Sequence, residues 1–293
     1  MKYDEMVAIL EATGDFRVLR RLKPGDHIYA PDGSATKMAL FVDVETTGLN
    51  SFRDEIIELA MIPFRYGPDG KIFEILEPFQ SLQQPKSDIS DEITKITGID
   101  ASMVEGQQID WSAVEKTVDQ ADIILAHNAA FDRKFLERYS DIFRLKPWGC
   151  SATQVGWKNE GFEGTRLAYL VAHAGYFYDR HRALNDCYAA VELLGKPLPK
   201  TGKFALASLL ENARAVTWRI WANHAPFDMK DNLKRRGYRW NNGDNGTPRA
   251  WYVDLPEEQR DTEVKFLQQE IYNWEAPISF RRIDAYDRFS SRA

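Results

Sequence analysis

The stretch FVDVETTGLN, residues 41–50, constrains this chain more than any other. Its first half is apolar and rich in β-prone side chains, and its threonines and Gly48 end the run, so it reads as a buried strand that enters a turn. Two acids, Asp43 and Glu45, interrupt the apolar residues. An acid pair inside a buried strand needs a physical explanation.

Asp43 and Glu45 are two positions apart, so their side chains point to the same face of the strand, about 7 Å apart along the chain. Paired carboxylates at the end of a buried strand repel each other unless a cation lies between them. Hard oxygen ligands of this kind suit Mg²⁺ or Mn²⁺. For the acid pair alone, a strand end with two solvated acids is an equally good interpretation.

Composition sets the broad class of the protein. The 293 residues, 44% apolar and 28% charged, fit an ordinary globular protein with one large domain, or with one medium and one small domain. We find neither a long apolar run nor a basic segment followed by an apolar core, so we expect no membrane span and no secretory signal. Cys150 and Cys187 are too few for a disulfide framework and fit a reducing cytoplasm.

Charge is distributed unevenly along the chain. Residues 202–293 carry 15 Lys and Arg against 13 Asp and Glu, whereas residues 1–201 carry 23 against 31. The acidic part holds the candidate metal site. The slight basic excess of the tail permits a nucleic-acid contact without requiring one.

The chain order predicts four parts. Residues 1–36 form an N-terminal extension with a helix over Tyr3 to Ala12 and a short strand. Residues 37–195 form the main domain, in which the Asp69-Gly70 turn joins apolar runs into an antiparallel meander. Residues 196–202 are a linker rich in Pro and Gly, and residues 203–293 read as a small α+β domain.

Two further segments place acids near the first pair. Asp132 lies in the first turn of a helix that follows the short apolar strand of residues 121–126, with Asn128 as its expected cap. His181 and Asp186 open another helix. The set matches two-metal phosphodiester cleavage, in which four carboxylates hold two divalent ions and a neutral histidine takes the proton of the attacking water.

At this point the sequence resembles the DEDDh 3′-to-5′ exonucleases, the group that contains the proofreading epsilon subunit of bacterial DNA polymerase III. FVDVETTGLN is similar to the first motif of that family, AHNAAFDRKFLE to the second and HRALNDCYAA to the third. The similarity covers residues 37–195. It implies a ribonuclease H-like fold, with a mixed β-sheet flanked by helices, and the release of nucleoside 5′-monophosphates from a 3′ end.

The resemblance also implies roles for individual residues. The expected metal ligands, for two Mg²⁺ or Mn²⁺ ions, are Asp43, Glu45, Asp132 and Asp186, and His181 is the expected general base. The residues expected to border the terminal nucleotide are Thr46, Gly48, Leu49, His127 and Asn128. For Leu49 and His127, a core or strand-end role is an equally good interpretation.

One detail of the third motif leaves an alternative. A variant of the superfamily uses a tyrosine ahead of its last acid, and Tyr178 lies just upstream of His181 here. We prefer His181, because its spacing to Asp186 is that of the histidine group.

Outside residues 37–195 the similarity to proofreading subunits ends, and we find no convincing segment for sliding-clamp binding. Residues 225–253 interleave basic and aromatic side chains, and they are similar to small modules appended to several nucleic-acid enzymes. Trp240 or Trp251 could stack on an unpaired base. The competing interpretation is that both tryptophans form the core of a small domain.

The sequence therefore predicts a cytoplasmic, metal-dependent 3′-to-5′ exonuclease acting on DNA, with a DNA polymerase or repair protein as its partner and no membrane contact. One alternative is an exoribonuclease that trims RNA or short oligoribonucleotides, since only the shape of the pocket senses the 2′ hydroxyl. The other is a non-catalytic nucleic-acid-binding or polymerase-partner module. Five intact motif positions argue against the second alternative.

Overall fold

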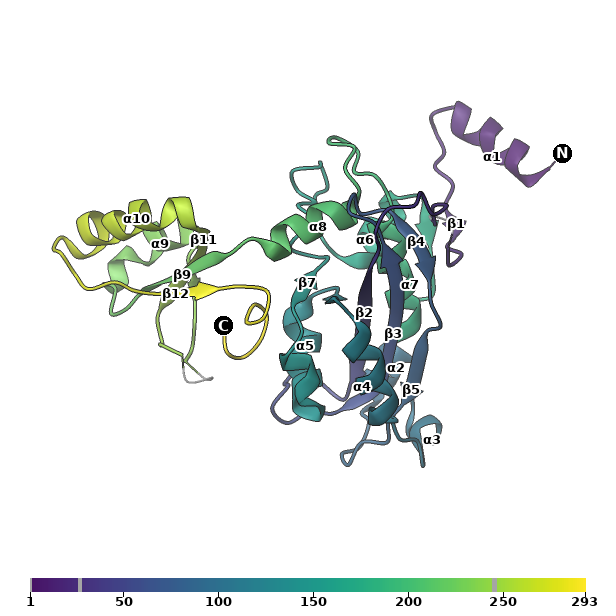
Figure 1. Cartoon of the computed structure of the whole chain (residues 1–293), viewed down its shortest axis with the longest axis horizontal. Helices are drawn as coiled ribbons and strands as arrows, with labels where there is room; N and C mark the ends of the chain where they lie inside the picture. Colours follow the sequence, from purple (N-terminus) through teal and green to yellow (C-terminus); the bar gives the residue numbers. More distant parts are fainter. Residues whose placement is uncertain (1, 26–27, 244–246) are drawn as a thin grey trace. The chain divides into compact units, whose positions relative to one another are not determined.

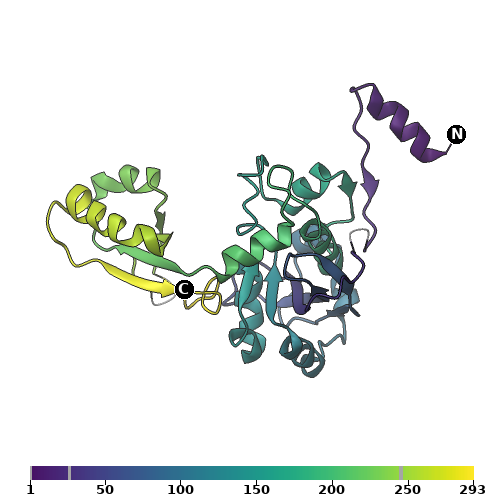
Figure 2. The ribbon, with the colours of Figure 1, turned by 45° about the horizontal axis from the view of Figure 1, so that its top comes forward.

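The computed structural model describes residues 2–25, 28–243 and 247–293. The chain forms two compact units, Met1–Asn212 and Ala213–Ala293, and each is described by itself. Figure 2 shows the main sheet with its helices in the first unit and a smaller sheet with helices in the second. None of the helices in the described residues combines the length and the hydropathy of a membrane span.

One mixed sheet organises the first unit (Figure 1). Its central strand, β2 (Lys37–Thr46), pairs antiparallel with β3 (Ile56–Tyr66) on one side and parallel with β6 (Ile123–Ala126) on the other. Strand β7 (Trp148–Cys150) extends the sheet beyond β6, also in parallel.

Two short strands, β4 (Ile72–Ile75) and β5 (Phe79–Leu82), both pair antiparallel with β3. The predicted antiparallel meander is therefore confirmed. Its third run is divided in two, because Pro78 lies in the break and proline cannot donate a hydrogen bond to a neighbouring strand.

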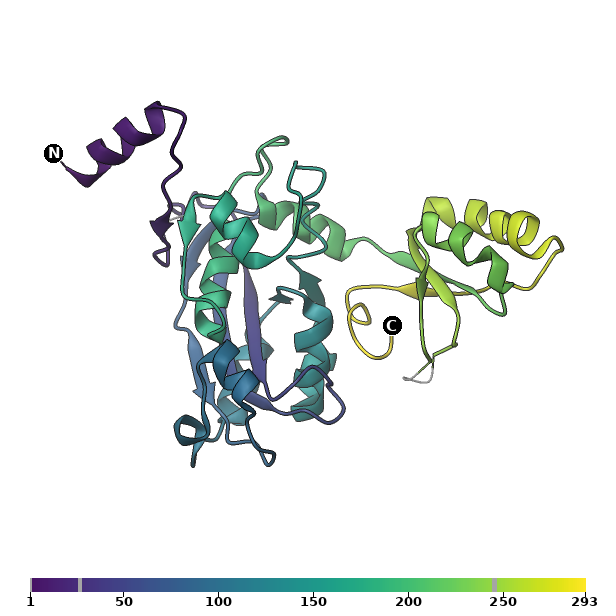
Figure 3. The same cartoon turned by 180° about the vertical axis from the view of Figure 1, so that it is seen from behind.

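Helices flank this sheet, as predicted (Figures 1 and 3). Helix α7 (Ala183–Leu194) packs against β2 and β3, and α5 (Ala129–Tyr139) contacts β2, β6 and β7. Strand β2 is buried on both faces, and its residues Leu40, Phe41 and Val42 have no exposed surface. The acids of this strand, Asp43 and Glu45, follow directly on this core and are themselves partly buried.

The remaining helices of the first unit follow the apolar spacing of the sequence. The predicted helix at the N-terminus is present as α1 (Tyr3–Ala12). The predicted helix capped by Ser90 is α2 (Asp91–Thr97), and it ends at Gly98, which takes a left-handed conformation. The remaining helical segments are α1 (Tyr3–Ala12), α2 (Asp91–Thr97), α3 (Ala101–Val104), α4 (Trp111–Gln120), η1 (Asp141–Arg144), α6 (Leu167–His173) and α8 (Ala205–Arg214).

The N-terminal extension adds a second, two-stranded sheet to the first unit. Strand β1 (Arg20–Arg21) pairs in parallel with β8 (Tyr176–Phe177), which leads into the third motif. Arg21 also binds Asp179, at 2.9 Å between Nη1 and Oδ2. The extension therefore contacts the loop that carries His181.

The boundary between the units falls later in the chain than the expected linker of residues 196–202. Helix α8 packs on the first unit: Ser208 donates to the Val155 carbonyl at 2.8 Å, and Asn212 donates to the Gln154 carbonyl at 2.8 Å. Its Leu206 and Leu209 are fully buried. Residues 203–212 thus belong to the first unit, because the apolar face of this amphipathic helix is buried there.

The second unit is a small α+β domain, as expected. Its sheet is antiparallel with strand order β10-β11-β9-β12, and its core contains Ile220, Leu233, Val253, Leu267 and Ile271. Its elements are β9 (Thr217–Ala222), η2 (Phe227–Met229), α9 (Lys230–Arg235), β10 (Arg239–Trp240), β11 (Trp251–Pro256), α10 (Glu257–Phe266), the π-helical turn η3 (Leu267–Tyr272) and β12 (Ser279–Ile283).

Candidate active site

Strand β2 places the first two acids. Asp43 lies opposite Ala60 of β3 and Glu45 lies opposite Glu58, so both acids belong to the ordered part of the ladder. The register shifts only after Glu45, at Thr46. The pleat of a regular strand therefore directs the two carboxylates to one face.

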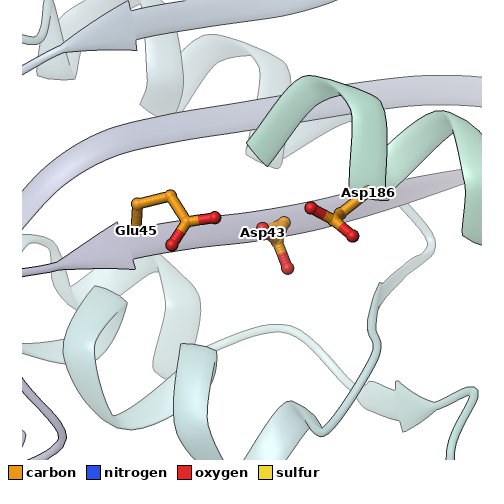
Figure 4. A group of neighbouring side chains, drawn as sticks. All are labelled: Asp43, Glu45 and Asp186. Carbon is orange, nitrogen blue, oxygen red and sulfur yellow. The ribbon is translucent and has the colours of Figure 1, made fainter. Parts of the chain in front are cut away.

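Helix α7 adds the third acid. One carboxylate oxygen from each of Asp43, Glu45 and Asp186 lies within 4.8 Å of the other two. Figure 4 shows Asp186 reaching from α7 toward the two side chains of β2. The first and third motifs, more than a hundred residues apart in the sequence, thus converge on one point.

Helix α5 adds Asp132 beside this group. Its Oδ1 accepts a hydrogen bond from the Val44 backbone N–H at 3.1 Å, and the side chain is 2% exposed. The pairing of β2 with β6 ends at Phe41, and the Asp132 carboxylate takes the N–H of Val44 beyond that end. The buried carboxylate is thereby fixed to the peptide backbone between Asp43 and Glu45.

Crowding and burial change the acidity of all four acids. Burial, followed by the charges of Asp132 and Asp186, raises the pKa of Asp43 well above its usual value. Burial and the charge of Asp186 raise the pKa of Glu45 to about 8, and burial raises that of Asp132 to about 8. Burial also raises the pKa of Asp186.

These shifts bear on what the site can hold. The four acids resist ionisation because they are buried and lie near one another. A bound cation would neutralise their negative charge and so stabilise the ionised carboxylates. The donors are all carboxylate oxygens, the ligand type of hard divalent cations such as Mg²⁺ and Mn²⁺. The residues present therefore fit a divalent metal centre.

The loop before α7 holds Asp186 from two sides. The Tyr178 hydroxyl donates to Oδ1 at 2.7 Å, and the His181 backbone N–H donates to Oδ2 at 2.8 Å. Burial and the charge of Asp186 raise the pKa of Tyr178, so its hydroxyl stays protonated and acts as a donor. A tyrosine in this state is unsuited to act as a base.

His181 itself is exposed and has a left-handed backbone, with a φ of 62°. This conformation is uncommon for a residue other than glycine. The bond from its N–H to Asp186 and the anchoring of the next residue, Arg182, hold it there. The histidine side chain is thus presented to solvent beside the acid cluster.

Sequence reasoning did not identify the residues that anchor Arg182. Glu58 of β3 has no exposed surface and accepts from Arg182 Nη2 at 2.9 Å, from Gln80 Nε2 at 2.7 Å and from the Ala183 backbone N–H at 3.0 Å. These bonds tie the start of α7 to the sheet. The available signal was a single acid, Glu58, inside the apolar run IIELAMI.

The turn after β2 contains three of the expected substrate contacts. Thr46 is buried, and its hydroxyl donates to the Gly48 carbonyl at 2.6 Å, so it stabilises the turn. A Cβ on Gly48 would lie 2.4 Å from Asp54 Oδ2, which explains the glycine. Leu49 is 87% exposed, which excludes the core interpretation for this residue.

His127 and Asn128 follow β6. Both ring nitrogens of His127 are engaged, Nδ1 with Ser151 Oγ at 2.8 Å and Nε2 with the Thr165 carbonyl at 2.8 Å, which favours the strand-end interpretation. Asn128 is the N-cap residue of α5, as expected, with a φ of 73°, and its side chain makes no capping hydrogen bond. With Leu49 it lines a cavity of about 220 Å³.

Comparison with known proteins agrees with this geometry. The family model described as "Exonuclease" matches residues 40–194, more than half of the chain. The matched segment contains all four acids and His181.

Curated relatives are named DNA polymerase III PolC-type. The protein from Caldanaerobacter subterraneus is 29% identical over 175 residues, which cover 58% of this chain and 12% of that protein. The protein from Thermotoga maritima is 34% identical over 198 residues, which cover 61% of this chain and 13% of that protein. The chain thus spans only a small part of the length of these relatives.

Among solved structures, the zinc-bound form of the E. coli ExoI–ssDNA complex is similar, with a TM-score of 0.51 and 16% identity. The alignment covers 79% of this chain and 67% of that one. This likeness concerns the fold, and it confirms the predicted mixed sheet flanked by helices.

Proposed function

Because this chain belongs to the exonuclease family, we propose that it is a metal-dependent 3′-to-5′ exonuclease that releases nucleoside 5′-monophosphates from DNA. The observation that carries the proposal is the convergence of Asp43, Glu45 and Asp186 within 4.8 Å, with Asp132 fixed to the backbone between the first two. A solvated strand end would not gather three partly buried carboxylates at one point beside the buried Asp132.

In this proposal Asp43, Glu45, Asp132 and Asp186 hold two divalent cations, Mg²⁺ or Mn²⁺. When bound, such ions supply positive charge for the phosphoryl oxygens and lower the pKa of an attacking water. The acids would fix the positions of the ions, and the charge of the ions would in turn attract the scissile phosphate. Tyr178 and the His181 N–H hold the Asp186 carboxylate in one orientation.

His181 is the proposed general base. Imidazole is the side chain whose protonation equilibrium lies nearest neutral pH, and His181 is exposed beside the acid cluster, where a water can reach it. The ring would take a proton from the attacking water as the water oxygen bonds to phosphorus. The bond from phosphorus to the 3′ oxygen of the penultimate nucleotide would break, and that oxygen would take a proton from solvent. We infer that the Gly48-Leu49 turn and Asn128 contact the terminal nucleotide, since Leu49 and Asn128 line one cavity.

DNA is the proposed substrate, and a replication or repair polymerase is the proposed partner. The support is the set of relatives named DNA polymerase III PolC-type, whose alignments cover about 60% of this chain. The acids act on the phosphodiester in DNA and RNA alike, so the pocket alone would select between them.

A gel time course tests the function. Oligonucleotides of DNA and of RNA, labelled at the 3′ or the 5′ end, are incubated with the full chain in Mg²⁺, Mn²⁺ or EDTA. We expect a metal-dependent ladder that shortens DNA from its 3′ end. A ladder on RNA alone would reassign the substrate, and a folded protein that cleaves nothing would contradict the proposal.

Two variants sharpen this test. Asp43→Asn should lower the rate more than about a hundredfold, because it removes a carboxylate at the centre of the cluster. His181→Ala should lower the rate at least about a hundredfold while metal binding, followed by calorimetry, is kept. His224→Ala, a histidine of the second unit, is the control, and near-normal turnover by His181→Ala would exclude this base.

A further inference from the structure

We propose that the second unit binds single-stranded nucleic acid along a stripe that combines exposed aromatic rings with lysines. The aromatic–basic stripe consists of Phe227, Lys230, Lys234, Trp251 and Trp240. The choice of ligand class rests on the proposed nuclease function, whereas the stripe itself follows from the contacts within this unit.

The stripe is continuous. Phe227, Lys230 and Lys234 are three and four positions apart along η2 and α9, so they share one side of this helical segment. Lys230 Nζ lies 4.2 Å from the centre of the Phe227 ring, and Lys234 Nζ lies 5.9 Å from that of Trp251. Trp240 follows, with its ring centre 5.5 Å from that of Trp251 at an interplanar angle of 67°.

The outer rings of the stripe are not part of the core. Phe227 is 81% exposed and Trp240 is 47% exposed, whereas Trp251 packs against the core of the unit. The core interpretation of the tryptophans therefore holds for Trp251 and fails for Trp240. Two exposed aromatic rings on either side of two lysines leave flat apolar surface available to a ligand.

The charges of the stripe are also available. Among residues 213–243 and 247–293, Lys230 and Lys234 form no ion pair with a carboxylate. By contrast, Arg236 on the same helical segment binds Glu263 at 2.8 Å. A phosphate would thus meet lysines whose charge no acid in the described part of this unit neutralises.

A second aromatic and basic cluster in this unit is already satisfied. Tyr252 has Arg219 at 4.4 Å and Arg239 at 4.9 Å from its ring centre, measured to each Cζ. Both arginines bind Asp254, at 2.7 Å and 3.0 Å. An acid at the centre of the cluster would repel phosphate, so we assign this cluster to fold stability.

The combination of aromatic rings and lysines in the stripe matches the chemistry of an unpaired strand. Single-stranded nucleic acid presents bases that stack on aromatic rings, linked by phosphates that bind lysine or arginine. In a duplex the bases are stacked inside, and only the phosphates would contact the stripe. The stripe should therefore prefer single strands, with little dependence on sequence.

A circular single-stranded oligothymidylate tests the proposal, because it has no 3′ end for the exonuclease site. Binding of the fluorescein-labelled circle to the full chain is measured by anisotropy in EDTA over a range of salt. The double variant Lys230→Gln, Lys234→Gln should bind more weakly, and its salt slope should be smaller by about 1.4, as expected for two lost phosphate contacts on a single strand.

Loss of stacking should have a different signature. Trp240→Ala should weaken binding about fivefold or more and leave the salt slope unchanged, because it removes stacking but no charge. Far-ultraviolet circular dichroism checks the fold of each variant. If the double variant does not fold, Lys234→Gln alone, at an exposed position, should reduce the slope by about half as much.

The matched control is Arg281→Gln, Arg282→Gln. These residues lie on β12, at the opposite edge of the sheet from β10, and each binds an acid, Asp287 or Asp284. The control removes the same charge as the lysine variant and should keep both affinity and slope. An equal loss in the control would overturn the proposal in favour of diffuse electrostatic attraction.

The remaining outcomes are also decisive. The proposal would be overturned if the lysine and tryptophan variants kept the affinity and the salt slope, or if duplex bound as tightly as the single strand. It would also be overturned if the circle did not bind at all, and that result would favour a protein ligand. Hydrolysis of a linear strand in Mg²⁺ is scored separately. A protein that binds the circle but cleaves nothing would keep the stripe and contradict the nuclease function.

Discussion

At the scale of single residues, Asp186 shows how much one carboxylate depends on its neighbours. Its two oxygens accept from Tyr178 and from the His181 N–H. One of them also lies within 4.8 Å of carboxylate oxygens of Asp43 and Glu45 (Figure 4). Partners that hold a ligand in this way fix its orientation before a metal binds. Tyr178 is therefore a positioning residue rather than a base.

Tyr178→Phe removes this hydrogen bond and little else. We expect metal affinity to fall by about tenfold to a hundredfold, because Asp186 then loses one of its two fixed partners. Titration calorimetry with Mn²⁺ measures the affinity directly, and Tyr188→Phe, on the helix α7 that carries Asp186, is the control. Unchanged affinity in the Tyr178 variant would show that Asp186 needs no such support.

The acid cluster also predicts how stability depends on pH without metal. The unfolded chain ionises Glu45 near 4.5, whereas the folded protein does so at about 8, so the folded state binds more protons between these values. The contribution of Glu45 to the free energy of unfolding is therefore fully present below pH 4.5, and it is lost as the pH rises toward about 8.

We therefore expect the Tm of Glu45→Gln, measured in EDTA, to rise relative to the Tm of the unmodified protein as the pH increases from 4.5 to about 8. Added Mn²⁺ should stabilise the unmodified protein most at the upper end, since metal binds the ionised acids. A relative Tm that stays constant or falls with rising pH would contradict this assignment.

At the scale of elements, the start of α7 is held by an ion pair beneath the site. Glu58 of β3 is fully buried and binds both Arg182 and the first N–H of α7. The same helix carries Asp186 one turn later, and His181 lies two residues before its first residue. The pair thus sets the position of two site residues without contacting substrate.

Arg182→Ala leaves the Glu58 charge buried with neutral partners only. We expect a loss of about 3 kcal/mol in the free energy of unfolding, because an uncompensated buried charge is costly. The double variant Glu58→Gln, Arg182→Ala should recover part of that loss, since the amide carries no charge. Urea denaturation measures both, and a double variant no more stable than the single one would contradict the argument.

At the scale of the whole molecule, helix α8 decides where the first unit ends. A chain cut after residue 202, at the expected linker, would lose the fully buried Leu206 and Leu209 of α8. A chain cut after Asn212 keeps them. We expect the shorter fragment to be less stable by more than about 3 kcal/mol, since burying each leucine contributes roughly 1.5–3 kcal/mol.

Thermal unfolding of the two fragments measures this difference. Only the longer one should keep metal-dependent hydrolysis of short oligonucleotides at 37 °C or below. Equal melting temperatures would show that α8 adds nothing to the first unit.

The sequence by itself located the acids of the candidate active site. Asp43, Glu45, Asp132, His181 and Asp186 were identified from local pattern, because strand alternation and helix starts place acids predictably. The same local signals gave the antiparallel meander, since a hairpin turn acts over a few residues.

Only the tertiary structure decided which groups surround these residues. The burial of Glu58, the bond from Tyr178 to Asp186 and the placing of α8 on the first unit join segments far apart in the chain. Such contacts depend on how elements pack, and no local propensity encodes them. The same reason separates Trp240 from Trp251: the two are alike in sequence, and only packing makes one core and leaves the other exposed.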